Sequence, residues 1–304
     1  MMVMNNNSNI NNENQTASDS CAIKSNSVKA NGLKIRRWVQ IGSAVVGNGY
    51  LKGFKSAGIY QGMLKKGCVP FLNCYSCPGA LFSCPIGAMQ ATISEAGGKF
   101  DITAIPMLVI GFLAFIGTLV GRAVCGWTCP FGFLQDLLNK IPSPKFKGYK
   151  WLSYIKYVIL IVFVFVLPAF WLDDYDMGAP TFCKYICPAG TLEGGIPLTL
   201  LNSSLRSQLG WLFTWKMAFL VAVLVLAVFF RRPFCRWVCP LGAFYGPFNK
   251  ISFKQIELDN NVCVKCGKCS TVCPMNLTVT EEINTCDCIR CYDCKSVCPV
   301  KAIK

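Results

Sequence analysis

Three long apolar runs constrain the fold of this chain more than any other feature. They extend over Ala104–Val124, Trp151–Leu172 and Trp211–Phe230, and each contains a single charged side chain. A helix needs roughly 20 apolar residues to cross a bilayer, and a backbone in lipid must satisfy its own hydrogen bonds. A fourth, more glycine-rich run at Trp38–Tyr60 is predicted as a further span. The sequence therefore predicts an all-α, multi-pass membrane domain with about four transmembrane helices.

The charges of the connecting loops predict the orientation of these helices. The loop between Val124 and Trp151 carries four lysines against one acid, whereas residues 173–210 carry four acids against two basic residues. Loops rich in lysine and arginine stay on the cytoplasmic side. The N-terminus and the residues after Phe230 are thus expected in the cytoplasm, with the protein in the cell membrane.

The chain divides into three parts by composition. Residues 1–33 are rich in asparagine and serine, which predicts disorder, and they lack the apolar core of a signal peptide. Cys21 in this part is expected to be an unligated thiol. Residues 34–254 form the predicted membrane domain, and residues 255–304 form a separate cysteine-rich domain.

The cysteine-rich end has the strongest motif. Two runs with the spacing C-x2-C-x2-C-x3-C-P follow one another, which is the pattern of bacterial two-cluster ferredoxins, where the fourth cysteine of each run ligates the other cluster. This predicts an α+β ferredoxin-like domain with two [4Fe–4S] clusters. Structural zinc, which also takes four thiolates, is the alternative. The predicted ligands of the first cluster are Cys263, Cys266, Cys269 and Cys298, and those of the second are Cys288, Cys291, Cys294 and Cys273.

A second cysteine motif shows that the membrane domain is an internal duplication. The stretches "CGWTCPFGFLQDLLNKI" and "CRWVCPLGAFYGPFNKI" begin at Cys125 and Cys235 and share most of their polar positions. Two crossings separate them, so both copies face the cytoplasm. Residues four apart at a helix end lie on one face. We therefore predict an inner [4Fe–4S] cluster; interface turns with free or bridged thiols are the alternative. Its predicted ligands are Cys125, Cys129, Cys235 and Cys239.

A matching set of cysteines is expected on the outer side. The stretches "CYSCPGALFSCPIGA" and "CKYICPAG" lie one crossing away from the inner motif. They suggest a fourth cluster, but disulfides are a serious alternative in an oxidising compartment. The predicted ligands are Cys77, Cys84, Cys183 and Cys187, with Cys74 as the alternative to Cys77. No role is predicted for Cys68 or Cys286.

Composition narrows the chemistry further. The chain has 20 cysteines and no histidine, which excludes a histidine base, histidine metal ligands and histidine-ligated haem. The formal net charge of +15 counts every thiol as neutral. Cluster thiolates would lower it, so the charge is weak evidence for a nucleic-acid partner and fits the basic loops of a membrane protein better.

Over residues 36–304 the chain resembles the NapH/NosR-type membrane-bound polyferredoxins. The resemblance rests on "CGWTCPFGFLQD", "CRWVCPLGAFYG" and the paired ferredoxin motifs. It implies a four-helix membrane part, a cytoplasmic ferredoxin module and a role in moving electrons between the quinol pool or a membrane partner and a redox enzyme, as part of a larger respiratory or reductase system. The outer motif departs from the simpler nitrate-reductase type and favours transfer across the membrane.

The sequence predicts an electron-transfer component rather than a stand-alone enzyme. One alternative is a quinol dehydrogenase with its own quinone site. Without histidine, a carboxylate such as Asp136 would have to accept the quinol proton, although a solvated interfacial acid is the simpler interpretation of that residue. The other alternative is a redox sensor or a factor for cofactor maturation.

Overall fold

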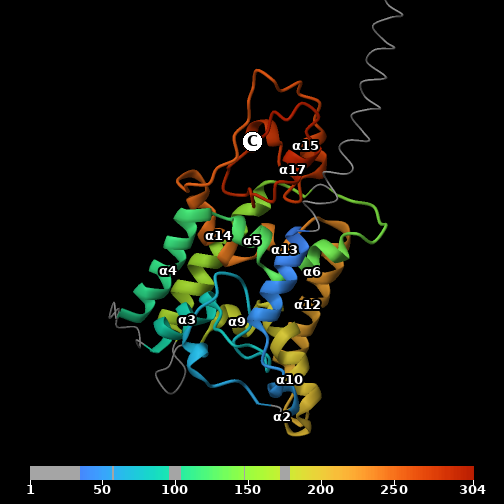
Figure 1. Cartoon of the computed structure of the whole chain (residues 1–304). Helices are drawn as coiled ribbons and strands as arrows, with labels where there is room; N and C mark the ends of the chain where they lie inside the picture. Colours follow the sequence, from blue (N-terminus) through green and yellow to red (C-terminus); the bar gives the residue numbers. More distant parts are fainter. Residues whose placement is uncertain (1–34, 57, 96–103, 147, 172–178) are drawn as a thin grey trace, which may run out of the picture.

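A computed structural model describes residues 35–56, 58–95, 104–146, 148–171 and 179–304 (Figure 1). The predicted disordered segment 1–33, with Cys21, lies outside the described residues. Within these ranges the chain is helical and has no strand, and β pairing is limited to isolated bridges between Cys68 and Ser83 and between Leu258 and Ile303. The prediction of a mainly helical fold is therefore confirmed, whereas the bounds of the membrane domain stay a prediction.

The duplication is visible in the order of the helices. In the first half, α4 (Ala104–Val120) leads into α5 (Ala123–Trp127) and α6 (Pro130–Leu138). In the second half, α12 (Trp211–Phe229) leads into α13 (Pro233–Trp237) and α14 (Pro240–Tyr245). A helix over residues 35–47, α2 (Lys52–Ser56), the 3-10 turn η1 (Met63–Lys66) and α3 (Pro85–Glu95) precede the first half.

The segment between the halves begins with one continuous helix. It comprises the 3-10 turn η2 (Trp151–Tyr154), α7 (Ile155–Ile159), the π-helical turns η3 (Leu160–Val166) and α8 (Leu167–Phe170). Within the π turns, the carbonyl of Phe163 accepts two hydrogen bonds from side chains of other segments. Gln90 donates at 2.6 Å and Thr181 at 2.7 Å. Then follow α9 (Thr181–Tyr185), the π-helical η4 (Gly190–Gly195), α10 (Ile196–Leu201) and α11 (Ser203–Ser207).

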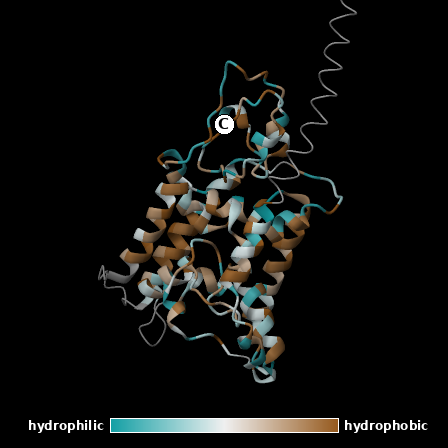
Figure 2. Cartoon of the chain, in the orientation of Figure 1, coloured by the Kyte–Doolittle hydropathy of each residue, from teal (hydrophilic) through white to brown (hydrophobic). Residues whose placement is uncertain are grey.

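Two helices are long and apolar enough to cross a membrane, namely Trp151–Phe170 and α12. Their apolar side chains face outward: Phe170 is 78% exposed and Trp211 is 80% exposed. Figure 2 shows the same apolar colouring along the helices in the middle of the molecule. A protein in water rarely leaves so much apolar surface uncovered, so these faces suit a lipid environment. The predicted count of about four spans is not confirmed.

The two other predicted spans are shorter than expected. α4 ends at Val120, before the predicted Val124, because Gly121 adopts a left-handed conformation (φ 59°) where a Cβ would lie 2.5 Å from the side-chain oxygen of Asn249. The predicted span Trp38–Tyr60 is wrong as a single helix. Its helix ends at residue 47, because the chain then pairs with a loop: Tyr50 N–H donates to Gly79, and Leu81 N–H donates to Gly47.

The C-terminal unit contains three short helices and follows the 3-10 turn η5 (Pro247–Lys250). The helices are α15 (Lys268–Val272), α16 (Val279–Glu282) and α17 (Asp293–Val297). The predicted α+β fold is confirmed only in its helical part. The closely spaced cysteine turns leave no run long enough for a strand, and pairing is confined to the two ends of the unit, where Asp259 N–H donates to Ala302 and Lys304 N–H donates to Glu257.

Figure 1 shows how these parts are arranged. α15 and α17 lie at one end of the molecule, with α5 and α13 directly beneath them. α3 and α9 lie farther from this end, and α2 and α10 lie at the opposite end. The two cysteine motifs on α5 and α13 are therefore next to the C-terminal unit, and the predicted outer motifs lie beyond them.

Candidate iron–sulfur sites

The eight cysteines of the C-terminal unit surround two cavities. Cys263, Cys266, Cys269 and Cys298 line one, and Cys273, Cys288, Cys291 and Cys294 line the other. The fold thus exchanges the fourth cysteine of each run between the two sites, as the spacing predicts. Iron ligation by these two sets stays a prediction.

The backbone around the two cavities repeats as well. Three pairs of residues at equivalent positions of the two cysteine runs have a positive φ. The pairs are Lys265 and Arg290, Gly267 and Tyr292, and Asn276 and Lys301. Left-handed residues between right-handed ones turn successive backbone N–H groups toward one point, which forms an anion-binding concavity found at many Fe–S sites. This geometry fits a cluster, whose sulfides and thiolates carry negative charge.

In the inner motif, each second cysteine opens a short helix. Cys129 precedes Pro130 at the start of α6, and Cys239 precedes Pro240 at the start of α14. The N–H groups of Gly132 and Gly242, two residues after the prolines, lie close enough to these thiols to favour the thiolate, although burial is the larger influence and raises the pKa of both thiols. The Cys-Pro-x-Gly sequence therefore directs a backbone donor at its own cysteine.

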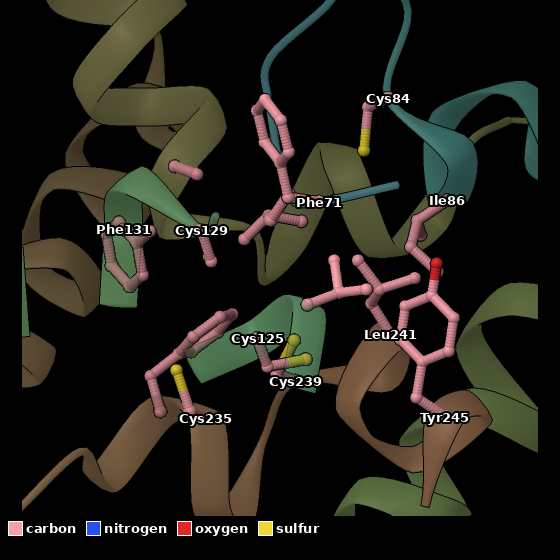
Figure 3. Close-up of a cluster of buried hydrophobic side chains, with 14 of the residues drawn as sticks. Phe71, Cys84, Ile86, Cys125, Cys129, Phe131, Cys235, Cys239, Leu241 and Tyr245 are labelled. Atoms are coloured by element: carbon pink, nitrogen blue, oxygen red, sulfur yellow. The ribbon is translucent and has the colours of Figure 1, made fainter. Parts of the chain in front are cut away.

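The structure brings the four inner cysteines together in one buried core. Cys125, Cys129, Cys235 and Cys239 are all at most 7% exposed. Figure 3 shows Cys125 and Cys239 adjacent to one another and near Cys235, at the facing ends of the helices that carry them. Two half-repeats thus supply two thiols each to a common place.

Two buried arginines tie the halves to each other. Arg122 donates to the carbonyl of Cys235 at 2.6 Å, and Arg232 donates to the carbonyl of Cys125 at 3.0 Å. Each arginine lies three residues before the cysteine of its own half and binds the cysteine backbone of the other half. Both side chains are fully buried, so their positive charge acts on the thiols through a poorly screened medium.

The pseudo-symmetry is broken by one hydrogen bond to sulfur. The side-chain amide of Gln135 donates to Sγ of Cys235 at 3.1 Å, while its carbonyl oxygen accepts from Phe234 N–H. The equivalent residue in the second half is Tyr245, whose hydroxyl donates instead to the carbonyl of Pro70. Cys235 therefore receives a side-chain amide donor, whereas the side-chain donor of its counterpart Cys125 is Arg122 and not Tyr245.

Asp136 differs from both interpretations of its sequence position. It forms a two-pronged ion pair with Arg232 at 2.6 and 2.7 Å and a second pair with Arg36 at 3.2 Å. Burial acts to raise the pKa of this carboxyl, but the arginines outweigh it and hold the pKa below its usual range. The expectation of a solvated interfacial acid is thus wrong, and a carboxylate held ionised by two arginines is a poor proton acceptor for a quinol.

The outer motifs meet at a cavity of ≈ 280 Å³. Four cysteines line it: Cys74, Cys84, Cys183 and Cys187. Cys74 and Cys187 both adjoin Gly190, whose N–H donates to Sγ of Cys187 at 3.3 Å. Cys77 is not part of this lining, so the geometry favours the predicted alternative, Cys74.

Charged groups of both signs adjoin the outer cavity. Glu193 accepts the N–H of Cys74 at 2.8 Å, and burial raises the pKa of its carboxyl to about 7. Lys216 lines the cavity and donates to the carbonyl of Cys183 at 3.2 Å. The outer site therefore has an acid in contact with one of its cysteines, which the described neighbours of the inner thiols do not provide.

The second cavity of the C-terminal unit lies against the inner motif. Trp127 Nε1 donates to the carbonyl of Arg290 at 3.0 Å, and a Cβ on Gly126 would lie 2.5 Å from the carbonyl of Ile289. Arg290 in turn donates to the carbonyl of Asn249. Only a glycine allows this approach of two backbones, one beside Cys125 and the other two residues before Cys291.

Among the described residues, no three cysteine or acidic side chains converge closely enough to hold a single metal ion, and all the described cysteines are free thiols. The C-terminal and outer cysteines instead line cavities, and the inner cysteines lie in a buried core. Disulfides, the alternative to an outer cluster, are not formed in the part of the chain that the structure describes.

The Cys-Pro-x-Gly motifs lie in segments that match a known protein family. The model of a 4Fe-4S binding domain matches residues 82–103, 100–148, 156–196 and 212–256. The chain belongs to the 4Fe-4S binding domain family. Each of the four matched segments includes one Cys-Pro-x-Gly unit, and these units begin at Cys84, Cys129, Cys187 and Cys239. The family assignment therefore rests on these motifs and not on the C-terminal unit.

Curated relatives agree with this family. An uncharacterized protein of Methanocaldococcus jannaschii is 34% identical over 55% of this chain and 64% of its own length. The Escherichia coli protein named "Putative electron transport protein YccM" is 24% identical over 65% of this chain and 54% of its own length. The regulatory protein NosR of Pseudomonas aeruginosa is 34% identical over 45% of this chain and 18% of its length. The chain thus matches less than two thirds of each relative. No solved structure matches.

These names confirm the resemblance to NapH/NosR-type proteins. The matched family model supports iron–sulfur clusters of the [4Fe–4S] type as the cofactor and leaves their number open. Arg122, Arg232 and Gln135 were not predicted from the sequence as part of a site. The two arginines had a signal, since both halves read Arg-x-x-Cys, whereas Gln135 has no counterpart in the other half.

Proposed function

We propose that this chain is a membrane-bound electron-transfer protein with four [4Fe–4S] clusters. The two clusters of the C-terminal unit, the inner cluster and the outer cluster form one series, with Cys74 in place of Cys77 as an outer ligand. The cofactor supplies one-electron chemistry, and the protein supplies the order of the sites and the surroundings of each. In this proposal the C-terminal unit faces the cytoplasm and electrons cross the bilayer.

The contact between Gly126 and Ile289 is the observation that carries this proposal. It supports the proposal because Gly126 is next to Cys125 and Ile289 is two residues before Cys291, so that two proposed ligands lie on backbones that touch. On the other side, Cys84 and Cys187 share one buried core with the inner cysteines. Figure 3 shows Cys84 across a layer of apolar side chains that includes Phe71, Ile86 and Leu241. The four cysteine sets therefore follow one another through the molecule.

The partner at the outer end is a membrane quinol or a protein subunit of a redox system. The names of the relatives support electron transport in general, and they leave the donor and the direction of flow to experiment. A proton-accepting role of Asp136 is not part of this proposal, because its ion pairs hold it ionised.

Electron transfer across vesicles tests the proposal. The full-length protein is reconstituted into vesicles that enclose oxidised cytochrome c, and dithionite is added outside. We expect reduction of the enclosed cytochrome by the wild type, and its loss in Cys239→Ala and in Cys187→Ala. Cys286→Ala is the matched control, since this cysteine belongs to none of the proposed sites.

The variants must first be shown to keep the EPR signals of the two C-terminal clusters, which separates loss of the route from loss of the fold. Transfer at the wild-type rate in Cys239→Ala would rule out the inner site as part of the route.

A further inference from the structure

A basic cavity between the membrane domain and the C-terminal unit has no role in the proposed route. Its volume is ≈ 440 Å³, and the described residues that line it include four cationic side chains and no acidic one. The cations are Lys145, Lys150, Arg231 and Arg236. The polar side of the cavity comes from the C-terminal unit and includes Ser270, Thr271 and Thr278.

The positive charge of this cavity is largely uncompensated. Lys150 pairs with Glu282 at 2.6 Å. Within the described part of the chain, no carboxylate lies within 4.0 Å of the other three cations, and Arg236 has Asp287 and Glu282 only at longer range. Lys145 and Arg231 are held by backbone carbonyls instead: Lys145 by Val228, and Arg231 by Thr271. Carbonyls fix the positions of these cations but do not neutralise them, so the cavity favours an anion.

The cavity lies at the end of a candidate membrane span. α12 ends at Phe229, and the ring of Phe146 packs against those of Phe229 and Phe230, with centroids 6.4 and 5.9 Å apart. Aromatic and basic side chains together at the end of an apolar helix mark the boundary between the hydrocarbon and water. Toward the middle of the same helix, Val225 and Leu226 are 50% and 38% exposed.

We propose that this cavity binds the phosphate of an acidic membrane phospholipid. The cations and hydroxyl groups would hold the headgroup, and the acyl chains would lie along the exposed apolar side of α12. Basic pockets between membrane helices on the cytoplasmic side bind such headgroups. A free phosphate would use the same cations but not the adjoining apolar surface. Because both parts of the chain line the cavity, the lipid would hold the C-terminal unit on the membrane domain. This inference does not rest on the electron-transfer route.

The test uses the full-length protein in a neutral detergent. Binding of phosphatidylglycerol, phosphatidylcholine and inorganic phosphate is measured by native mass spectrometry and by the shift of the unfolding temperature. We expect selective binding of phosphatidylglycerol. A cation near an acidic lipid contributes about 1 kcal/mol, so each one removed weakens binding roughly fivefold, and Lys145→Gln with Lys150→Gln weakens it roughly 25-fold.

Two further variants keep the result interpretable. Lys250→Gln with Lys254→Gln removes two exposed cations that do not line the cavity, and it should bind phosphatidylglycerol like the wild type. Arg231→Gln should repeat the loss in the cavity. Equal binding of phosphatidylcholine, or no loss in the cavity variants, would overturn the proposal. Full competition by inorganic phosphate would show a soluble anion as the ligand and would also overturn it.

Discussion

The inner and outer cysteine sites use the same Cys-Pro-x-Gly unit but differ in the charges that surround them. At the inner site, Arg122 and Arg232 cross between the halves and lie fully buried beside the thiols. At the outer site, Glu193 contacts Cys74, and the cysteines line a cavity together with the half-buried Lys184 and Lys216. Cluster potentials depend on nearby charge, hydrogen bonds to sulfur and solvent exposure. Cations favour the more negative, reduced state, and they act more strongly when fully buried, as Arg122 and Arg232 are, so the inner cluster should have the higher reduction potential.

The largest expected effect distinguishes two cysteines of the outer site. Cys74 lines the cavity with Cys84, Cys183 and Cys187, whereas Cys77 does not. Cys74→Ala should therefore lose one cluster, about four irons per chain. Cys77→Ala should keep the wild-type iron content. The opposite result from the two variants would restore the original assignment of Cys77.

Removal of a buried ion pair at the inner site should have the next largest effect. Arg232→Gln leaves Asp136 without its two-pronged partner, and breaking such a pair costs about 3–5 kcal/mol. Lys150→Gln removes an exposed pair with Glu282 and should cost no more than about 1 kcal/mol. The unfolding temperature in detergent at neutral pH measures both.

The ion pair between Asp136 and Arg232 predicts how the stability of the protein depends on pH. The pKa of Asp136 is lowered in the fold, so its stabilisation is present at neutral pH and is lost as the pH falls through that lowered value. Asp136→Asn should therefore reduce stability at neutral pH and make little difference in strong acid. A constant difference across this range would contradict the ion-pair role.

Two equivalent glycines test the packing of the halves. A Cβ at Gly242 would lie 2.8 Å from Nη2 of Arg122, while one at Gly132 would lie 3.4 Å from Nη1 of Arg232. Gly242→Ala should destabilise the protein by about 1–3 kcal/mol through overpacking, and Gly132→Ala by less. Thermal unfolding of the two variants measures the difference, and equal effects would mean that the halves are packed alike.

The smallest expected effect concerns the single hydrogen bond to Cys235. Gln135→Leu removes the donor at 3.1 Å. A hydrogen bond of about 1 kcal/mol to the reduced state corresponds to roughly 40 mV for one electron, so the inner cluster should become harder to reduce by about that amount. Tyr245→Phe changes the equivalent position, whose hydroxyl binds Pro70, and should leave the potential unchanged. A redox titration followed by EPR measures both.

The sequence predicted those parts of the molecule that repeat. The cysteine spacing identified the two groups that line the C-terminal cavities, including the exchange of Cys273 and Cys298. The duplicated motif predicted that Cys125, Cys129, Cys235 and Cys239 would meet. Two copies of one motif are expected to fold in the same way. A repeated cysteine spacing therefore predicts that equivalent cysteines of the two copies lie in equivalent places.

The features that the sequence did not predict depend on contacts between distant segments. The break after residue 47 is fixed by hydrogen bonds to Gly79 and Leu81, which a hydropathy pattern does not report. Asp136 looked like an interfacial acid because its partners, Arg36 and Arg232, lie far away in the chain. The choice between Cys74 and Cys77 required the cavity itself, since both belong to the same loop.

The iron content of the intact protein tests the number of clusters most directly. Iron and acid-labile sulfide are measured per chain after anaerobic purification in detergent, together with EPR of the reduced protein. Four [4Fe–4S] clusters predict about 16 irons and about 16 sulfides. A value of about 8, with only the signals of the C-terminal unit, would show that the membrane cysteines hold no cluster and would contradict a transfer route through them.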